Sequence, residues 1–133
     1  MRRFPIILIS SVIFFASQVA VADLANEMLS EFQQQGVQAD AAAGKRLWST
    51  VFVDKKTAQQ RSCTTCHGDH PNQRGKHAKT GKLIEPMAPA VNGERLTERK
   101  KINKWFKRNC KWTIGRECTA QEKADFLTFL IGY

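Results

Sequence analysis

The sequence has no internal repeat, no low-complexity segment and almost none of the apolar–polar alternation that is typical of strands. Acidic residues are scarce as well: 12 Asp and Glu stand against 21 Lys and Arg, and the formal net charge is +9. At 133 residues the chain is too short for a two-domain nucleotide-binding enzyme or a closed barrel. Its 42% hydrophobic and 25% charged residues argue against disorder and predict one globular domain with a modest core.

One apolar run stands apart at the N-terminus. Residues 1–3 (MRR) form a short basic region, and residues 4–15 are almost continuously apolar. Residues 20–22 form the A-x-A pattern that a signal peptidase recognises. This apolar core of about 12 residues is too short to cross a bilayer as a helix. We therefore expect residues 1–22 to be an export signal cleaved after Ala22, and residues 23–133 to form the exported domain.

The compartment follows from this export signal. No later stretch approaches the 18 apolar residues of a membrane-spanning helix, so no transmembrane segment is expected after cleavage. The expected destination is the bacterial periplasm, where disulfides form and persist.

Helical periodicity dominates the exported domain, because apolar residues recur three or four positions apart. Helices are expected from Asp23 to a stop at Gly36, over 40–52, over 97–108, and after a Thr119–Glu122 capping box. The class is therefore all-α, with four or five helices. The expected apolar sides are Leu24, Met28 and Phe32; Leu47, Trp48, Val51 and Phe52; Ile102, Trp105 and Phe106; and Phe126, Leu127, Leu130 and Ile131.

Two features depart from this helical pattern. Gly44 lies inside the second expected helix, where glycine costs about 1 kcal/mol relative to alanine. We expect it to allow close approach of the last helix, near Phe126 or Leu130. Residues 61–92 contain repeated glycine and proline and predict a loop with one short helix at most. A loop of this length is unusual in a compact domain unless it wraps something, such as a cofactor.

That loop contains a C-x-x-C-H motif at residues 63–67, which is typical of c-type haem attachment. Two thiols at this spacing can each add to a vinyl group of one haem. We therefore predict one haem c bound covalently through Cys63 and Cys66, with His67 as the proximal iron ligand. Structural zinc is less well supported, because Cys110 and Cys118 are too far apart for the usual second pair. A redox dithiol would need a βαβ frame that the pattern lacks.

Cys110 and Cys118 are left over after haem attachment. In an oxidising compartment, two cysteines with seven residues between them are most simply a disulfide that closes a short loop. The chain-entropy model assigns such a loop roughly 2.5 kcal/mol of stabilisation.

The second axial ligand separates electron carriers from ligand binders. His70 and His77 follow His67 too closely to reach the opposite face of the haem. Met28 belongs to the apolar side of the first helix, so we expect it to pack in the core. Met87 follows the motif by 20 residues and lies among prolines, as methionine ligands of small cytochromes often do.

A further candidate comes from a resemblance that covers about residues 44–130. The sequence resembles the sphaeroides haem protein family, which comprises small class I c-type cytochromes that bind oxygen. This resemblance implies a class I cytochrome c-like fold of four to five helices around one haem. The segments that carry it are Thr80–Pro89 (TGKLIEPMAP), Trp105–Cys110 (WFKRNC), Ile114–Thr119 (IGRECT) and Glu122–Asp125 (EKAD).

The resemblance also implies a ligand set. Asn109 corresponds to the asparagine that is the distal ligand of the oxidised haem, and Cys110 and Cys118 correspond to a disulfide beside the iron. The family does not need a methionine at the position of Met87, yet this sequence has one. Met87 therefore remains the alternative distal ligand.

The two distal candidates predict different functions. An amide oxygen is a hard donor that suits Fe(III), whereas methionine sulfur holds Fe(II). Asn109 should therefore leave on reduction and open one haem face to O2, NO or CO. Ligation by His67 and Met87 instead predicts a simple electron carrier. An enzyme acting on nitric oxide or peroxide is a third possibility, for which the motifs identify no catalytic acid or base.

A cationic stretch precedes and surrounds Asn109. This basic helix, residues 99–111, is predicted to be a docking surface for an acidic redox partner, because charge steers encounter. A solvated face and an anionic membrane surface are the alternatives, and no nucleic-acid partner is expected in the periplasm. The family resemblance implies a dihaem cytochrome c or a membrane-bound cytochrome b as the partner. The cations of the basic helix are Arg99, Lys100, Lys101, Lys104, Lys107, Arg108 and Lys111.

Overall fold

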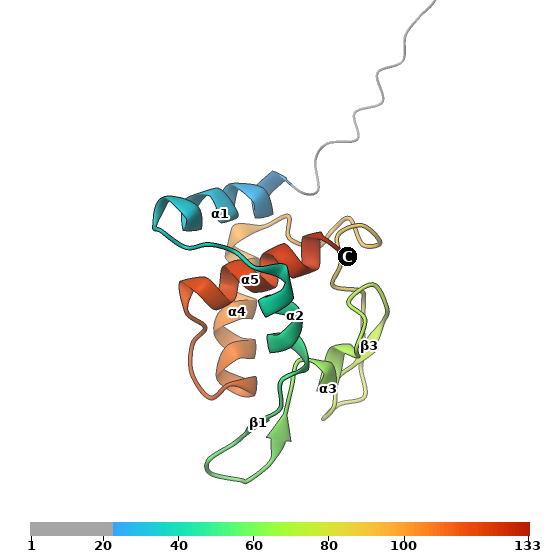
Figure 1. The fold of residues 1–133 in the computed structure, drawn as a ribbon. Helices are drawn as coiled ribbons and strands as arrows, with labels where there is room; N and C mark the ends of the chain where they lie inside the picture. The colour runs from blue at the N-terminus through green and yellow to red at the C-terminus, as the bar shows by residue number, and fades with distance from the viewer. Residues whose placement is uncertain (1–22) are drawn as a thin grey trace, which may run out of the picture.

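The computed structural model describes residues 23–133, and in this part of the chain five helices and two small ribbons follow one another (Figure 1). The expected export signal lies outside the described residues. The all-α class is confirmed, since each strand is only two residues long. The helices are α1 (Asp23–Gln34), α2 (Ala41–Ser49), α3 (Thr64–His67), α4 (Arg99–Thr113) and α5 (Ala120–Ile131). The antiparallel ribbons are β1 (Phe52–Val53) with β2 (Gln60–Arg61), and β3 (Gly75–Lys76) with β4 (Leu83–Ile84).

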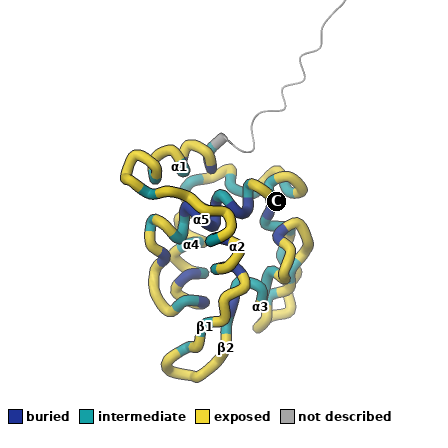
Figure 2. Tube along the Cα trace, viewed as in Figure 1, coloured by how far each residue is buried: buried dark blue, intermediate teal, exposed yellow. Residues whose placement is uncertain are grey.

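Helix α5 lies at the centre of the domain, and α1 and α2 both pack against it (Figure 1). It is the most continuously buried helix, as its dark blue trace shows in Figure 2. Two buried groups of side chains meet along it. The aromatic cluster consists of Trp48, Cys110, Cys118, Phe126, Phe129 and Leu130. The aliphatic cluster consists of Ala25, Met28, Ile102 and Leu127.

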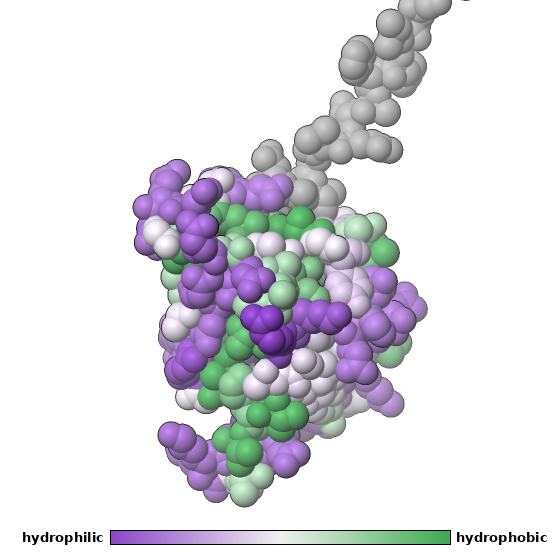
Figure 3. All heavy atoms as spheres, in the orientation of Figure 1, coloured by the Kyte–Doolittle hydropathy of each residue, from purple (hydrophilic) through white to green (hydrophobic). Residues whose placement is uncertain are grey.

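Helix α2 starts as expected and ends earlier than expected. The Asp40 carboxylate accepts a hydrogen bond from the Ala42 backbone N–H at 2.7 Å, which caps the helix. The helix then ends at Ser49, and Val51 and Phe52 do not belong to its apolar side, so that prediction was wrong. The β-branched residues from Thr50 onward favour extended backbone. Val51 is 56% exposed, and apolar atoms gather at this β1 end of the molecule (Figure 3).

The expected close approach at Gly44 is present, displaced by one residue. A Cβ at Gly44 would overlap the backbone carbonyl of Asp125 and lie 2.8 Å from Cβ of Phe129. The neighbours are thus Asp125 and Phe129, whereas Phe126 and Leu130 were predicted.

Helix α4 runs from Arg99 to Thr113. It therefore starts slightly later than the predicted 97–108 and continues well beyond the predicted end. Asn109 therefore lies in its interior. Ile102 and Cys110 are buried on its core side, but Trp105 is 43% exposed, so its predicted place on the apolar side was wrong. Trp105 lies beside the stripe of residues four apart that faces α5.

The start of α5 agrees with its sequence signature. The Thr119 hydroxyl accepts from the Glu122 N–H at 3.1 Å, and the Glu122 carboxylate accepts from the Thr119 N–H at 2.8 Å. A Cys110–Cys118 disulfide with Cα atoms 5.5 Å apart links α4 to the residue before this cap. No helix within residues 23–133 has the length and apolar character needed to cross a membrane.

Candidate haem site

The C-x-x-C-H motif folds as one helical turn because hydroxyl groups cap its start. The Thr65 N–H donates to the Ser62 hydroxyl at 3.2 Å, and the Ser62 N–H donates to the Thr65 hydroxyl at 3.0 Å. This reciprocal pair satisfies two backbone donors, as in a capping box. At the other end Gly68 has a φ of +71°, a conformation that favours glycine and stops the helix. The two cysteines and the histidine therefore project from a single short turn.

Both motif cysteines are free thiols in the structure. Cys63 packs against the aromatic cluster, and burial raises its pKa to about 12. A buried, protonated thiol is a poor nucleophile, unlike the low-pKa cysteine of a redox dithiol. The disulfide removes Cys110 and Cys118 from any zinc site, and residues 23–133 contain no cluster of three metal-ligating side chains.

His67 is enclosed by the same group of side chains. Its ring centroid lies 5.4 Å from that of Trp48, whose indole N–H donates to the Gly68 carbonyl at 2.9 Å. Its Nδ1 is buried and has no hydrogen-bond partner within the described chain. Burial lowers the pKa of His67 to about 4, and the charge of Arg95 adds to the effect. The imidazole is therefore neutral at neutral pH, the form that ligates iron.

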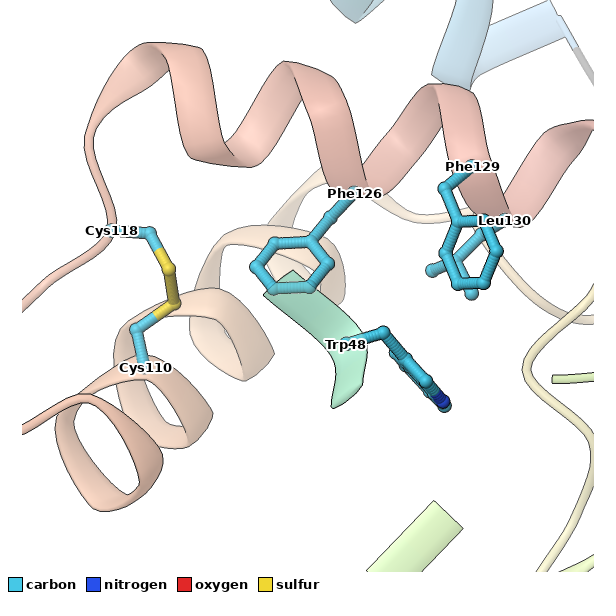
Figure 4. Close-up of a cluster of buried hydrophobic side chains, with 6 residues drawn as sticks. All are labelled: Trp48, Cys110, Cys118, Phe126, Phe129 and Leu130. Atoms are coloured by element: carbon cyan, nitrogen blue, oxygen red, sulfur yellow. A yellow bond between two sulfur atoms is a disulfide. The ribbon is translucent and has the colours of Figure 1, made fainter. Parts of the chain in front are cut away.

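These residues fit a covalently attached haem. Two free thiols and a neutral, half-buried imidazole lie on one turn, at the side of the aromatic cluster. Figure 4 shows how this cluster is built: Phe126, Phe129 and Leu130 extend from α5 toward Trp48 of α2, and the disulfide lies on the other side of Phe126.

The β3–β4 ribbon supports the attachment helix from outside. A Cβ at Gly75 would overlap the Cys66 carbonyl and lie 2.7 Å from the Cα of His67, so only glycine fits against this turn. The Ala78 N–H donates to the Cys66 sulfur at 3.3 Å. Neither Ser62 nor Gly75 was identified from the sequence as part of the site. The available signal was S-x-x-T at 62–65, which resembles a capping box.

Met87 is partly buried and packs against the aromatic cluster. Its backbone N–H donates to the carbonyl of Pro71 at 2.7 Å, four residues after His67. The preceding carbonyl, that of Pro86, accepts from the Arg95 guanidinium at 2.8 Å. The Met87 loop is thus bound to the chain segment that directly follows His67.

Asn109 is half-buried in the interior of α4, next to the disulfide and thus beside the aromatic cluster. Its side-chain amide forms no hydrogen bond to any described residue. Within residues 23–133 this amide is therefore not held by another protein group.

The other axial candidates lie elsewhere. Met28 is 3% exposed and packs in the aliphatic cluster with Leu127, as its place on the first helix predicts. His70 bonds through Nδ1 to the Tyr133 hydroxyl at 2.7 Å. Nδ1 of His77 faces its own loop, where it accepts from the Thr80 N–H at 3.2 Å.

The basic helix is not uniformly cationic in three dimensions. Acids from α1 approach its start, where Arg99 pairs with Glu27 at 2.9 Å and with Glu31 at 2.7 Å. Lys101 pairs with Glu98, and Lys111 pairs with Glu117 at 3.1 Å. Within residues 23–133 the cations of this helix without an acidic partner are Lys100, Lys104, Lys107 and Arg108.

Comparisons with known proteins place this chain among c-type cytochromes. A family described as a domain of unknown function (DUF1924) matches residues 34–130. The cytochrome c-type protein SHP of Cereibacter sphaeroides is 42% identical over 95 residues, which are 71% of this chain and 72% of that protein.

Solved structures extend the comparison to the fold. Oxidised SHP, described as an oxygen-binding cytochrome c, superposes with a TM-score of 0.72 at 36% identity, covering 82% of this chain and 96% of SHP. The solution structure of cytochrome c'' from Methylophilus methylotrophus, which concerns haem-ligand detachment, gives 0.75 at 26% identity and covers 84% and 95% of the two chains. The class I cytochrome c-like fold and the covalent haem c are confirmed by these relatives.

Proposed function

Since this chain belongs to the DUF1924 family and is a c-type cytochrome, we propose that it accepts one electron, releases an asparagine ligand on reduction and then binds O2, NO or CO. Residues 23–133 form the monohaem domain. The haem supplies an iron that changes oxidation state and a coordination position on each face.

The residues that hold the haem are Cys63, Cys66 and His67. Their support is the capped helical turn, the two free thiols and the neutral imidazole beside Trp48. Nδ1 of His67 is buried and has no hydrogen-bond partner among the described residues. Trp48 and Gly75 restrict the ring and the turn from two sides.

The observation that carries the proposal is the state of Asn109. Its amide has no hydrogen bond within residues 23–133, and the Cys110–Cys118 disulfide anchors the adjacent backbone beside the aromatic cluster. The disulfide restrains the backbone and leaves the rotamer of Asn109 free. An amide oxygen binds Fe(III) better than Fe(II), so a one-electron reduction weakens this ligand. The structure of cytochrome c'', which concerns haem-ligand detachment, supports a ligand that can leave the iron.

The rival distal ligand, Met87, predicts a simple electron carrier. The Met87 backbone donates to Pro71, and Arg95 of the same loop is near enough to His67 to lower its pKa. Both observations associate the Met87 loop with the proposed proximal ligand. A distal ligand has to approach the opposite face, so these contacts favour Asn109.

The proposal also covers the compartment of the protein and its redox partner. We propose that residues 1–22 direct export to the periplasm. A redox partner with an acidic surface, such as a dihaem cytochrome c or a membrane cytochrome b, docks on the basic helix. The ion pairs of Arg99, Lys101 and Lys111 shift the expected contact to the unpaired cations Lys100, Lys104, Lys107 and Arg108.

The absorption spectrum of the anaerobically reduced holoprotein, before and after addition of CO, tests the proposed function. The expected result is a five-coordinate, high-spin ferrous spectrum that shifts with CO. A sharp low-spin spectrum that is indifferent to CO would overturn gas binding and identify an electron carrier.

Two variants identify the distal ligand. Asn109→Ala should convert the ferric haem to high spin, whereas Met87→Leu should leave it low spin. The reverse pattern would identify Met87 as the distal ligand. Met28→Leu is the matched control, because Met28 lies in the aliphatic cluster and its replacement should leave both spectra unchanged.

A further inference from the structure

Asn109 has a tryptophan one helical turn away on each side. Trp105 precedes it by four residues and Trp112 follows it by three, and side chains at these two spacings share one face of an α-helix. Trp105 is 43% exposed and Trp112 is 40% exposed. Single exposed apolar residues are ordinary. Two exposed indoles on the same helix face as a candidate iron ligand form a distinct surface.

An arginine holds each of the two rings. The guanidinium carbon of Arg108 lies 5.4 Å from the ring centroid of Trp105, and that of Arg61 lies 4.8 Å from the ring centroid of Trp112. Both distances are within the range of cation–π attraction. The rings are therefore braced against the helix, although they face solvent.

Arg61, which stacks on Trp112, also connects two parts of the site. Arg61 donates to the Trp112 carbonyl at 2.9 Å and pairs with Asp54 at 2.8 Å. It lies in β2, directly before Ser62 and the attachment turn. Arg61 thus ties the end of α4, one turn beyond Asn109, to the strand that enters the haem-binding motif.

Another side of α4 is buried in the core. Ile102, Cys110 and Thr113 are each less than 8% exposed. A small molecule from solvent therefore cannot reach the Asn109 amide through this packed side. The exposed side chains one turn from Asn109 on α4 are Trp105 and Trp112.

We propose that Trp105 and Trp112 flank the path by which gases reach the position that Asn109 vacates, and that they select for small diatomic molecules. This inference rests on the proposed gas-binding function. Indole faces are apolar and have only one polar group, so they exclude water and accommodate uncharged diatomics. Each ring also places bulk one turn from Asn109, which hinders a larger molecule more than a diatomic one.

The experiment measures how fast the reduced holoprotein binds two probes of different size, CO and an alkyl isocyanide. Trp105→Ala and Trp112→Ala should each accelerate isocyanide binding by about tenfold, the order expected when bulk is removed from an apolar pocket. Both should accelerate CO binding less. The phenylalanine variants should restore much of the discrimination between the two probes.

Controls separate this inference from the function on which it rests. Asn103→Ala, at an exposed position on the same helix, should leave both rates unchanged. Equal rates in wild type and all tryptophan variants, with CO binding intact, overturn the inference and leave the proposed function standing. Failure of the wild type to bind CO overturns the proposed function itself. If an alanine variant does not incorporate haem, the leucine variants of both tryptophans provide the same comparison.

Discussion

Gly44 of α2 lies directly against the backbone carbonyl of Asp125 in α5. No Cβ fits between the two helices at this point, so their axes approach more closely than ordinary side chains allow. The contact positions Trp48, one turn further along α2, against Phe129 with ring centroids 5.9 Å apart. Because Trp48 also packs on His67, this helix crossing supports the proposed proximal ligand.

Gly44→Ala is expected to lower the free energy of unfolding by about 1–3 kcal/mol, because the added methyl overlaps backbone that cannot move aside cheaply. This loss outweighs the gain of about 1 kcal/mol in helix propensity. Urea denaturation of the holoprotein measures it. Gly132→Ala is the matched control, since its nearest contact would be the Thr128 carbonyl at 3.4 Å. An equally stable Gly44→Ala protein would contradict the close crossing.

Gly75→Ala is expected to reduce covalent haem attachment. Its Cβ would overlap the Cys66 carbonyl and displace the turn that presents both thiols. The measurement is the ratio of haem to polypeptide in purified protein, read from absorption of the denatured, covalently bound haem. Lys76→Ala, at the exposed neighbouring position, should incorporate haem like wild type. Full occupancy in Gly75→Ala would show that β3 does not support the motif.

Asp125→Ala is expected to destabilise the domain by about 1–3 kcal/mol, because it removes a buried acceptor that joins the start of α2 to α5. Asp125 is 4% exposed, and its Oδ1 accepts from the Asp40 N–H at 2.8 Å and from the Gln121 amide at 2.7 Å. Thermal unfolding of the two variants Asp125→Ala and Asp125→Asn tests this role. The asparagine keeps an oxygen acceptor and should retain most of the stability; equal losses in both would refute a role as acceptor.

The stability of the domain should fall in acid partly through Glu122. The guanidinium of Arg116, with two hydrogen bonds of 2.7 Å, holds the pKa of Glu122 below its ordinary value of 4.5. A carboxylate whose pKa is lower in the folded state stabilises the fold above the unfolded pKa. That stabilisation is lost as the pH falls through the folded pKa.

The measurement for this effect is the free energy of unfolding between about pH 6 and pH 3. Glu122→Gln should show a shallower decline than wild type, and a parallel decline would count against the Glu122 contribution. Glu94→Gln, an exposed carboxylate outside the ion pairs of residues 23–133, should follow the wild-type curve.

Local signals predicted the helices well wherever short-range chemistry controls them. The Thr119–Glu122 capping box predicted the start of α5, and its apolar stripe predicted Phe126, Leu127 and Leu130 as buried. The predicted end of α2 was wrong, because apolar periodicity continued through Val51 and Phe52 while their β-branched surroundings favoured a strand. The extension of α4 to Thr113 was missed, since residues 109–113 (NCKWT) contain only one strong helix former, Lys111.

The chemistry of the chain was readable from the sequence by itself, because a C-x-x-C-H spacing and a pair of leftover cysteines depend only on neighbours along the chain. The tertiary structure decided which residues surround that chemistry. Gly75 contacts the attachment turn, Glu31 neutralises Arg99, and Arg61 braces Trp112. These contacts join segments far apart in sequence, and packing of the whole domain sets such distances, which no local pattern records.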